Sequence, residues 1–146
     1  MSSALFTQIF LILLAGTLLT RLWLARRHVR HVLGHRRQVP APFRGKILLK
    51  AHRKAADYTA AKTRFAMLAG TIDALLLLGW TLGGGLEFLD QGWRAAQFGE
   101  LVTGTLFLLS VFLIGGLLDL PATLYQTFGI EQRFGFNRST PALFAA

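Results

Sequence analysis

Three of the four histidines are spaced so that one face of a helix would carry them. His28, His31 and His35 follow one another at intervals of three and four residues, which places side chains on the same side of an α-helix. Imidazole nitrogen is a common zinc ligand, so this face could hold a metal. Against that interpretation, no carboxylate is near in sequence and five arginines surround the rings, namely Arg26, Arg27, Arg30, Arg36 and Arg37. Repulsion between cations favours a structural or lipid-headgroup role for the histidines over a metal site.

Asp73 is the single ionisable residue well inside the second long apolar run. A charge in a membrane span is unfavourable and usually faces a partner or a water-filled cavity. A functional role and a plain hydrogen bond to a neighbouring helix both remain open for it. The sequence contains no H-E-x-x-H, no G-x-S-x-G and no phosphate-binding loop. We therefore predict no metal ligand and no catalytic residue on this chain, and no hydrolase activity from the chain alone.

The elements that must position these groups are three long apolar runs. Hydrophobic residues make up 53% of the 146 residues and charged residues 16%, with a mean hydropathy of +0.46. Soluble domains carry about 25% charged residues. The runs cover about 5–24, 65–89 and 101–118, and about 20 residues are needed to cross a bilayer core. In the second run, Gly79 and Gly83 have the spacing that lets membrane helices approach closely. The predicted fold is all-α, a multi-pass membrane protein with three transmembrane helices.

Basic residues are concentrated between the first two runs. Residues 21–64 contain thirteen of the sixteen Lys and Arg residues, with Asp57 as the only acid. Those expected to determine the topology are Arg26, Arg27, Arg30, Arg36, Arg37, Arg53 and Lys54. Because positively charged loops stay in the cytoplasm, we predict an inner-membrane protein with its N-terminus outside and with residues 25–64 and the C-terminal tail inside. The expected partners are the lipid bilayer and its anionic headgroups. Nucleic acid is not expected, because no nucleic-acid module accompanies the charge.

An amphipathic stretch leads into the second apolar run. Gly34 is predicted to end the first helix, and Pro40 and Pro42 indicate a turn or an extended connection. From about Gly45 the pattern becomes helical again, with one side formed by Leu48, Ala51, Ala55, Tyr58 and Thr59. We predict a basic amphipathic cytoplasmic segment that lies along the membrane surface or a partner helix and continues into the second span.

The polar and aromatic tail, residues 119–146, carries the most specific pattern. It reads Leu120-Pro121-x-x-Leu124-Tyr125-x-Thr127-Phe128-x-Ile130-Glu131-x-x-Phe134-Gly135-Phe136-Asn137. This stretch resembles a signature of the type I CAAX prenyl protease family of integral-membrane zinc metallopeptidases, and His52–Thr59 is similar to the bacterial branch of that family. The resemblance implies a ring of membrane helices around a large chamber, with zinc held downstream by H-E-x-x-H and a later Glu. The candidate structural or chamber-facing residues are Asp73, Asp119, Tyr125, Glu131, Arg133 and Asn137.

The end of the sequence suggests an incomplete element. Thr140 and Pro141 suit the cap and first position of a helix, and only five residues follow them. We expect the N-terminal membrane region, residues 1–146, of a CAAX prenyl protease, inactive alone and truncated before the zinc-binding helices. Its partner would be the missing C-terminal catalytic region or another chain that supplies it. Zinc would be the cofactor of the full-length family, with none on this chain. The alternative is a stand-alone three-span scaffold or subunit without enzymatic activity.

Overall fold

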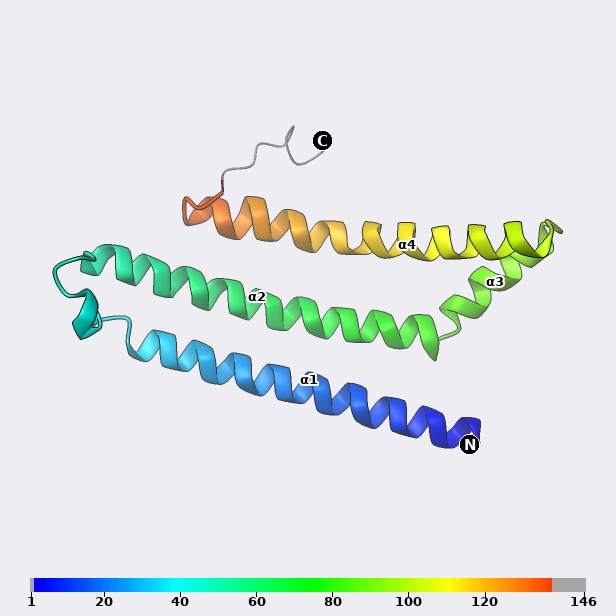
Figure 1. Ribbon diagram of the computed structural model, residues 1–146, viewed down its shortest axis with the longest axis horizontal. Coiled ribbons are helices and arrows are strands. Elements are labelled where there is room, and N and C mark those ends of the chain that lie inside the picture. Colours follow the sequence, from blue (N-terminus) through cyan, green and yellow to red (C-terminus); the bar gives the residue numbers. More distant parts are fainter. Residues whose placement is uncertain (1, 138–146) are drawn as a thin grey trace. The chain divides into compact units, whose positions relative to one another are not determined.

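The computed structural model describes residues 2–137, and its regular elements are helices. They are α1 (Ser3–Gly34), the short 3₁₀ helix η1 (Ala41–Phe43), α2 (Leu49–Thr81), α3 (Gly85–Ala95), α4 (Glu100–Leu124) and the π-helix η2 (Tyr125–Glu131) (Figure 1). Of the described residues, 2–71 and 126–137 form one compact unit and Ile72–Tyr125 form a second. Three helices are long and apolar enough to cross a membrane. The prediction of an all-α membrane protein is confirmed. The predicted helix start at Thr140 and Pro141 lies outside the described residues.

The first helix is longer than the bilayer core is thick. Its 32 residues give a length of about 48 Å, at about 1.5 Å per residue, against a hydrocarbon thickness of about 30 Å. The Ser2 hydroxyl caps its start by accepting the N–H of Leu5 at 3.4 Å. Inside the apolar run, the Thr20 hydroxyl donates to the Gly16 carbonyl at 2.7 Å, which satisfies a polar group that lipid cannot solvate. The helix ends at Gly34 as predicted, so its basic last third extends beyond the apolar run.

The second helix continues from the basic segment into the apolar run without a break, as predicted. The face it buries, however, coincides only in part with the predicted apolar side, of which Tyr58 and Thr59 are half-buried. Ala56 and Ala60 are buried, one turn apart, whereas Ala51 and Ala55 are exposed. His52 lies one turn before Ala56, and its Nε2 donates to the backbone carbonyl of the residue that follows α1 at 3.1 Å. This hydrogen bond therefore lies on the same face of α2 as the buried Ala56 and Ala60.

A run of glycines ends α2 at Thr81, before the predicted limit of Leu89. Gly84 has a φ of +79°, a left-handed conformation that side chains with a Cβ rarely adopt. A Cβ on Gly83 would lie 2.6 Å from the Gly79 carbonyl oxygen. The expectation that Gly79 and Gly83 form a helix-packing face is therefore corrected, because Gly83 lies in the turn that terminates the helix and approaches Gly79 itself. The chain then starts again as α3.

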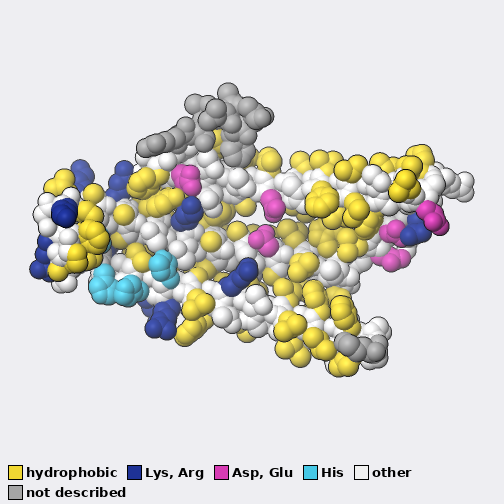
Figure 2. Space-filling model, viewed as in Figure 1, with side chains coloured by type: hydrophobic (Ala, Val, Ile, Leu, Met, Phe, Trp, Pro, Cys, Tyr) yellow, Lys and Arg dark blue, Asp and Glu magenta, His cyan; other side chains and the backbone are white. Residues whose placement is uncertain are grey.

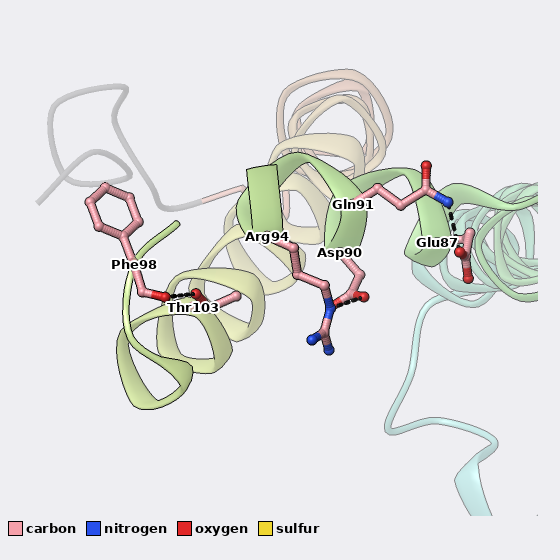
Figure 3. A network of polar contacts seen from close by, with 6 residues as sticks. All are labelled: Glu87, Asp90, Gln91, Arg94, Phe98 and Thr103. Atoms are coloured by element: carbon pink, nitrogen blue, oxygen red, sulfur yellow. Dashed lines mark hydrogen bonds and ion pairs between the residues drawn. The ribbon is translucent and has the colours of Figure 1, made fainter. Parts of the chain in front are cut away.

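In the second unit, α3 and α4 are held together by polar side chains. The Trp93 indole Nε1 donates to the Ser110 Oγ at 3.0 Å, from α3 to α4. At the start of α4 the Thr103 hydroxyl donates to the Phe98 carbonyl at 3.2 Å (Figure 3). Thr103 is the buried polar residue of the described chain, 8% exposed, and this bond satisfies its hydroxyl. The two contacts fix the turn between the helices.

The exposed side of α3 carries two local polar pairs (Figure 3). The Arg94 Nε donates to Asp90 Oδ2 at 2.6 Å, and the Gln91 amide donates to Glu87 Oε1 at 2.7 Å. Both pairs join residues four apart, which are neighbours on a helix surface. The connection between the second and third apolar runs thus contains a short helix that keeps its charges outward.

Most apolar side chains of the long helices are uncovered, as the yellow surface in Figure 2 shows. The most apolar windows of α1 and α2 contain no buried residue. Large side chains such as Ile12, Leu101 and Phe112 are exposed by 70%, 84% and 76%. Soluble proteins rarely expose apolar patches of this extent. Lipid or further membrane helices must cover these surfaces in the native environment.

Candidate functional site

The segment that follows α4 folds against α2, and Tyr58 is the centre of this contact. The Tyr58 hydroxyl donates to Glu131 Oε1 at 3.4 Å. The Lys62 Nζ donates to the same hydroxyl at 3.4 Å and forms an ion pair with Glu131 Oε1 at 3.5 Å. Tyr58 and Lys62 are four residues apart and therefore share one face of α2. One cation, one anion and one hydroxyl thus form a closed triangle between α2 and the tail.

Two phenylalanines of the tail enclose the same tyrosine. The ring of Phe134 meets that of Tyr58 edge-on, with centroids 5.6 Å apart, and the ring of Phe136 is tilted at 4.7 Å. The Lys54 Nζ lies over the Phe136 ring at 5.1 Å from its centroid. Aromatic pairs in such arrangements contribute about 0.5–1.5 kcal/mol each beyond the area that they bury. We call this set of contacts, made by Lys54, Tyr58 and Lys62 with Glu131, Phe134 and Phe136, the tail-docking contact.

The backbone of the tail is shaped to bring these side chains to α2. The helix changes to the wider π form in η2, which buries Ile130 at 7% exposure. π turns are rare and occur frequently at functional sites. The chain then turns at Gly135, whose φ is +65°. The Glu131 carbonyl accepts the N–H groups of Phe136 at 2.9 Å and Asn137 at 3.2 Å. Glu131 therefore holds the turn with its backbone and contacts α2 with its side chain.

The triangle also sets the charge state of its lysine. The hydrogen bond with Tyr58 raises the pKa of Lys62, and the Glu131 carboxylate raises it further, while desolvation acts in the opposite direction. Lys62 therefore stays charged at neutral pH. Its side chain is 44% exposed, so solvent screens the ion pair, and its net contribution is at most about 1 kcal/mol.

The histidines do not gather into a metal site. The rings of His31 and His35 lie 4.3 Å apart, and His35 Nδ1 donates to the His31 carbonyl at 2.9 Å. His52 bonds to the backbone of His35, while His28 takes no part in these contacts. Within residues 2–137, no group of three or more His, Asp or Glu side chains is placed to hold a metal ion. The His52 imidazole instead joins the end of α1 to the start of α2, and those of His31 and His35 contact each other at the end of α1.

A second polar contact lies close to these histidines. Arg36 Nη2 forms an ion pair with Asp57 Oδ2 at 2.6 Å and joins the turn after α1 to α2. Arg36 also lines an open pocket of about 280 Å³ together with Arg37 and Arg53. The sequence pointed to the basic segment as a whole, and Asp57 was its only acid. The structure shows that, among these many cations, Asp57 pairs with Arg36.

The structure brings together only part of the predicted site. Glu131 and Asn137 belong to the docked tail, Tyr125 begins η2 with 58% exposure, and Arg133 is exposed. Asp73 and Asp119 are exposed, and neither carboxylate has an ion pair or hydrogen bond within residues 2–137. Their roles stay predictions. Sequence reasoning did not select Tyr58 and Lys62 as site residues, although their spacing on the amphipathic stretch was the available signal.

Comparisons with known proteins identify the family of this chain. Residues 28–146 match a family model described as CAAX prenyl protease N-terminal, five membrane helices. The chain is 32% identical over 134 residues to the CAAX prenyl protease 1 homolog of Caenorhabditis elegans, which covers 90% of this chain and 29% of that protein. It is 27% identical over 139 residues to the probable CAAX prenyl protease 1 of Schizosaccharomyces pombe, covering 84% of this chain and 28% of that protein. The homolog of Mus musculus is 33% identical over 87 residues, covering 60% of this chain and 17% of that protein.

The matched region contains α2, α3, α4, η2 and the whole tail-docking contact. The chain spans less than a third of the length of these curated relatives. The predicted resemblance is confirmed, and with its helices of membrane-spanning length the chain belongs to the CAAX prenyl protease N-terminal family.

Proposed function

We propose that this chain supplies the N-terminal membrane helices of a CAAX prenyl protease-like zinc metalloendopeptidase, which cleaves membrane-associated or CAAX-type proteins. The observation that carries the proposal is the tail-docking contact, which lies wholly within the residues that match the family. The tail leads out of α4, so its attachment to Tyr58 and Lys62 fixes the position and direction of the chain after the third span. The role of this chain is therefore to orient the catalytic region of a protease relative to these helices.

The residues present do not fit a zinc site. The 146 residues contain no H-E-x-x-H, and residues 2–137 contain no group of three or more potential ligands in reach of one another. Zinc in such a protease would polarise the scissile carbonyl and activate water. We assign no catalytic step to this chain, and we propose that the metal and the catalytic Glu come from another region, in the same protein or in a second chain.

The proposed orientation places residues 25–64 and the tail in the cytoplasm and α3 outside the cell membrane. The concentration of Lys and Arg around the connection between α1 and α2 (Figure 2) supports it, because basic loops are retained on the inside. The chain has no cysteine, so single cysteines can report the topology. A thiol reagent that does not cross membranes should label Gln38→Cys only in inverted vesicles and Gln91→Cys only in right-side-out vesicles. The opposite pattern would contradict the orientation.

A chimera tests the proteolytic role. The aligned N-terminal region of the Caenorhabditis elegans relative is replaced by this chain, and cleavage of a peptide with a prenylated cysteine is measured with and without a zinc chelator. We expect chelator-sensitive cleavage, reduced by Tyr58→Ala and largely kept by Tyr58→Phe. The unmodified relative is the control for the assay. A chimera that inserts and binds zinc but does not cleave would favour the alternative of a membrane scaffold or subunit.

A further inference from the structure

Three arginines surround an open pocket at the connection between α1 and α2. Arg36 and Arg37 come from the turn after α1 and Arg53 from the beginning of α2, and the pocket has a volume of about 280 Å³. Only Arg36 has a carboxylate partner, Asp57 at 2.6 Å. Within residues 2–137 the guanidinium groups of Arg37 and Arg53 take part in no ion pair or hydrogen bond. The pocket therefore holds three guanidinium groups against one carboxylate.

This excess of positive charge around a small volume favours the binding of an anion. Like charges that line one pocket repel each other, and an anionic ligand between them removes that repulsion. Guanidinium groups present paired N–H donors in a planar fork that matches phosphate oxygens. We propose that the pocket formed by Arg36, Arg37 and Arg53 binds the phosphate group of an anionic ligand. The proposal concerns binding only and does not depend on proteolysis.

The position of the pocket along the helices indicates where the phosphate comes from. Arg36 lies twelve residues beyond Leu24, the predicted end of the first span. At about 1.5 Å per helical residue, this path puts the pocket about 18 Å from the hydrocarbon boundary. The headgroup layer is only about 5–8 Å thick on each side. Arg27, about 5 Å beyond Leu24 by the same rise, lies at headgroup level. The geometry thus favours a water-soluble phosphate compound over a bilayer lipid.

Titration of pyrophosphate into the purified chain in phosphatidylcholine nanodiscs tests the site by calorimetry. We expect Arg53→Gln and Arg37→Gln each to weaken binding about tenfold, the usual loss for one charge-assisted hydrogen bond. Arg53→Lys keeps the charge but loses the planar fork of N–H donors. Its affinity for pyrophosphate should lie between that of the Gln variants and that of the wild type. Asp57→Asn should tighten binding, because it frees Arg36. Arg27→Gln removes the same charge outside the pocket and should change binding by less than about twofold, given screening over that distance.

The control and a lipid arm decide between the outcomes. Equal weakening by Arg27→Gln and Arg53→Gln would overturn the proposal, because the attraction would then come from diffuse charge. Repeating the titration in nanodiscs that contain phosphatidylglycerol separates the two sources of phosphate. If phosphatidylglycerol prevents pyrophosphate from binding, or itself binds to the chain in a way that depends on Arg53, the site exists and its ligand is a membrane lipid. Failure of the wild-type chain to bind either probe would overturn it.

Discussion

Replacing Tyr58 by alanine should release the tail from α2. The change removes two ring contacts, with Phe134 and Phe136, worth about 1 kcal/mol each. It also removes the hydrogen bond to Glu131, for which we take only about 1 kcal/mol because its length of 3.4 Å exceeds the usual O–H···O distance. The sum of about 3 kcal/mol raises the undocked population about 100-fold. Tyr58→Phe removes only the hydroxyl and should raise that population about fivefold, for about 1 kcal/mol.

Hydrogen exchange in lipid nanodiscs measures this equilibrium directly. The amides of Phe136 and Asn137 are protected by their bonds to the Glu131 carbonyl, so their exchange follows the opening of the turn. We expect faster exchange at both amides in the order Tyr58→Ala, Tyr58→Phe, wild type. The apolar run 5–24 of α1 makes none of these contacts, and its exchange serves as the control for global unfolding.

Two results would refute the reasoning. If Tyr58→Phe accelerated exchange as much as Tyr58→Ala, the polar triangle would hold the tail and the ring contacts would contribute nothing. If neither variant changed the exchange of Phe136 and Asn137, the tail would be held by something other than Tyr58. A loss of protection that extended equally to residues 5–24 would show unfolding of the unit and not release of the tail.

Three further predictions concern single sites. Gly84→Ala should destabilise the chain by about 1 kcal/mol, because a Cβ is strained at a φ of +79°. Gly92→Ala, with open space around it, should instead stabilise α3 slightly. Thermal unfolding in detergent compares the two variants. Lys62→Gln should weaken tail docking by less than about 1 kcal/mol after solvent screening. Because the pKa of Lys62 is raised above 10.5, this contribution is complete below pH 10.5 and is lost as the pH rises through the raised value, so exchange of wild type and variant should converge there. Arg94→Gln should leave the melting temperature unchanged, because the side chain is 70% exposed and meets Asp90 only at the surface.

The sequence was sufficient for the membrane helices because length and hydropathy determine them directly. The end of α1 at Gly34 and the continuous passage of α2 into the apolar run both follow from local residue types. The predicted end of the second span, Leu89, lies too far along the chain, because α2 ends at Thr81. Three consecutive glycines weaken a helix, but which of them takes the positive φ depends on the backbone around it. Gly84 takes that conformation, and the helix stops before it.

The tail-docking contact could be predicted only in part. Glu131 was a candidate, but its partner Tyr58 is 73 residues away in the sequence, and a periodic pattern relates only neighbours on one helix. The π form of η2 adds to the difficulty, because it changes the direction of side chains that ordinary helical spacing would place elsewhere. The exposed carboxylates of Asp73 and Asp119 illustrate the same limit. What a carboxylate in a membrane helix contacts depends on the helices that pack beside it, and the pattern along its own helix does not specify them.

The two bonds that join α1 to α2, Arg36 with Asp57 and His52 with the His35 carbonyl, enclose the connecting residues 37–51 between them. The helix ends are therefore tied together independently of the length of that connection. Lengthening a flexible loop costs only about 0.6 kcal/mol for each doubling. An epitope or a fluorescent protein inserted between Val39 and Gly45 should thus leave the helix pair assembled, which makes this connection a natural place to attach a tag for imaging or purification.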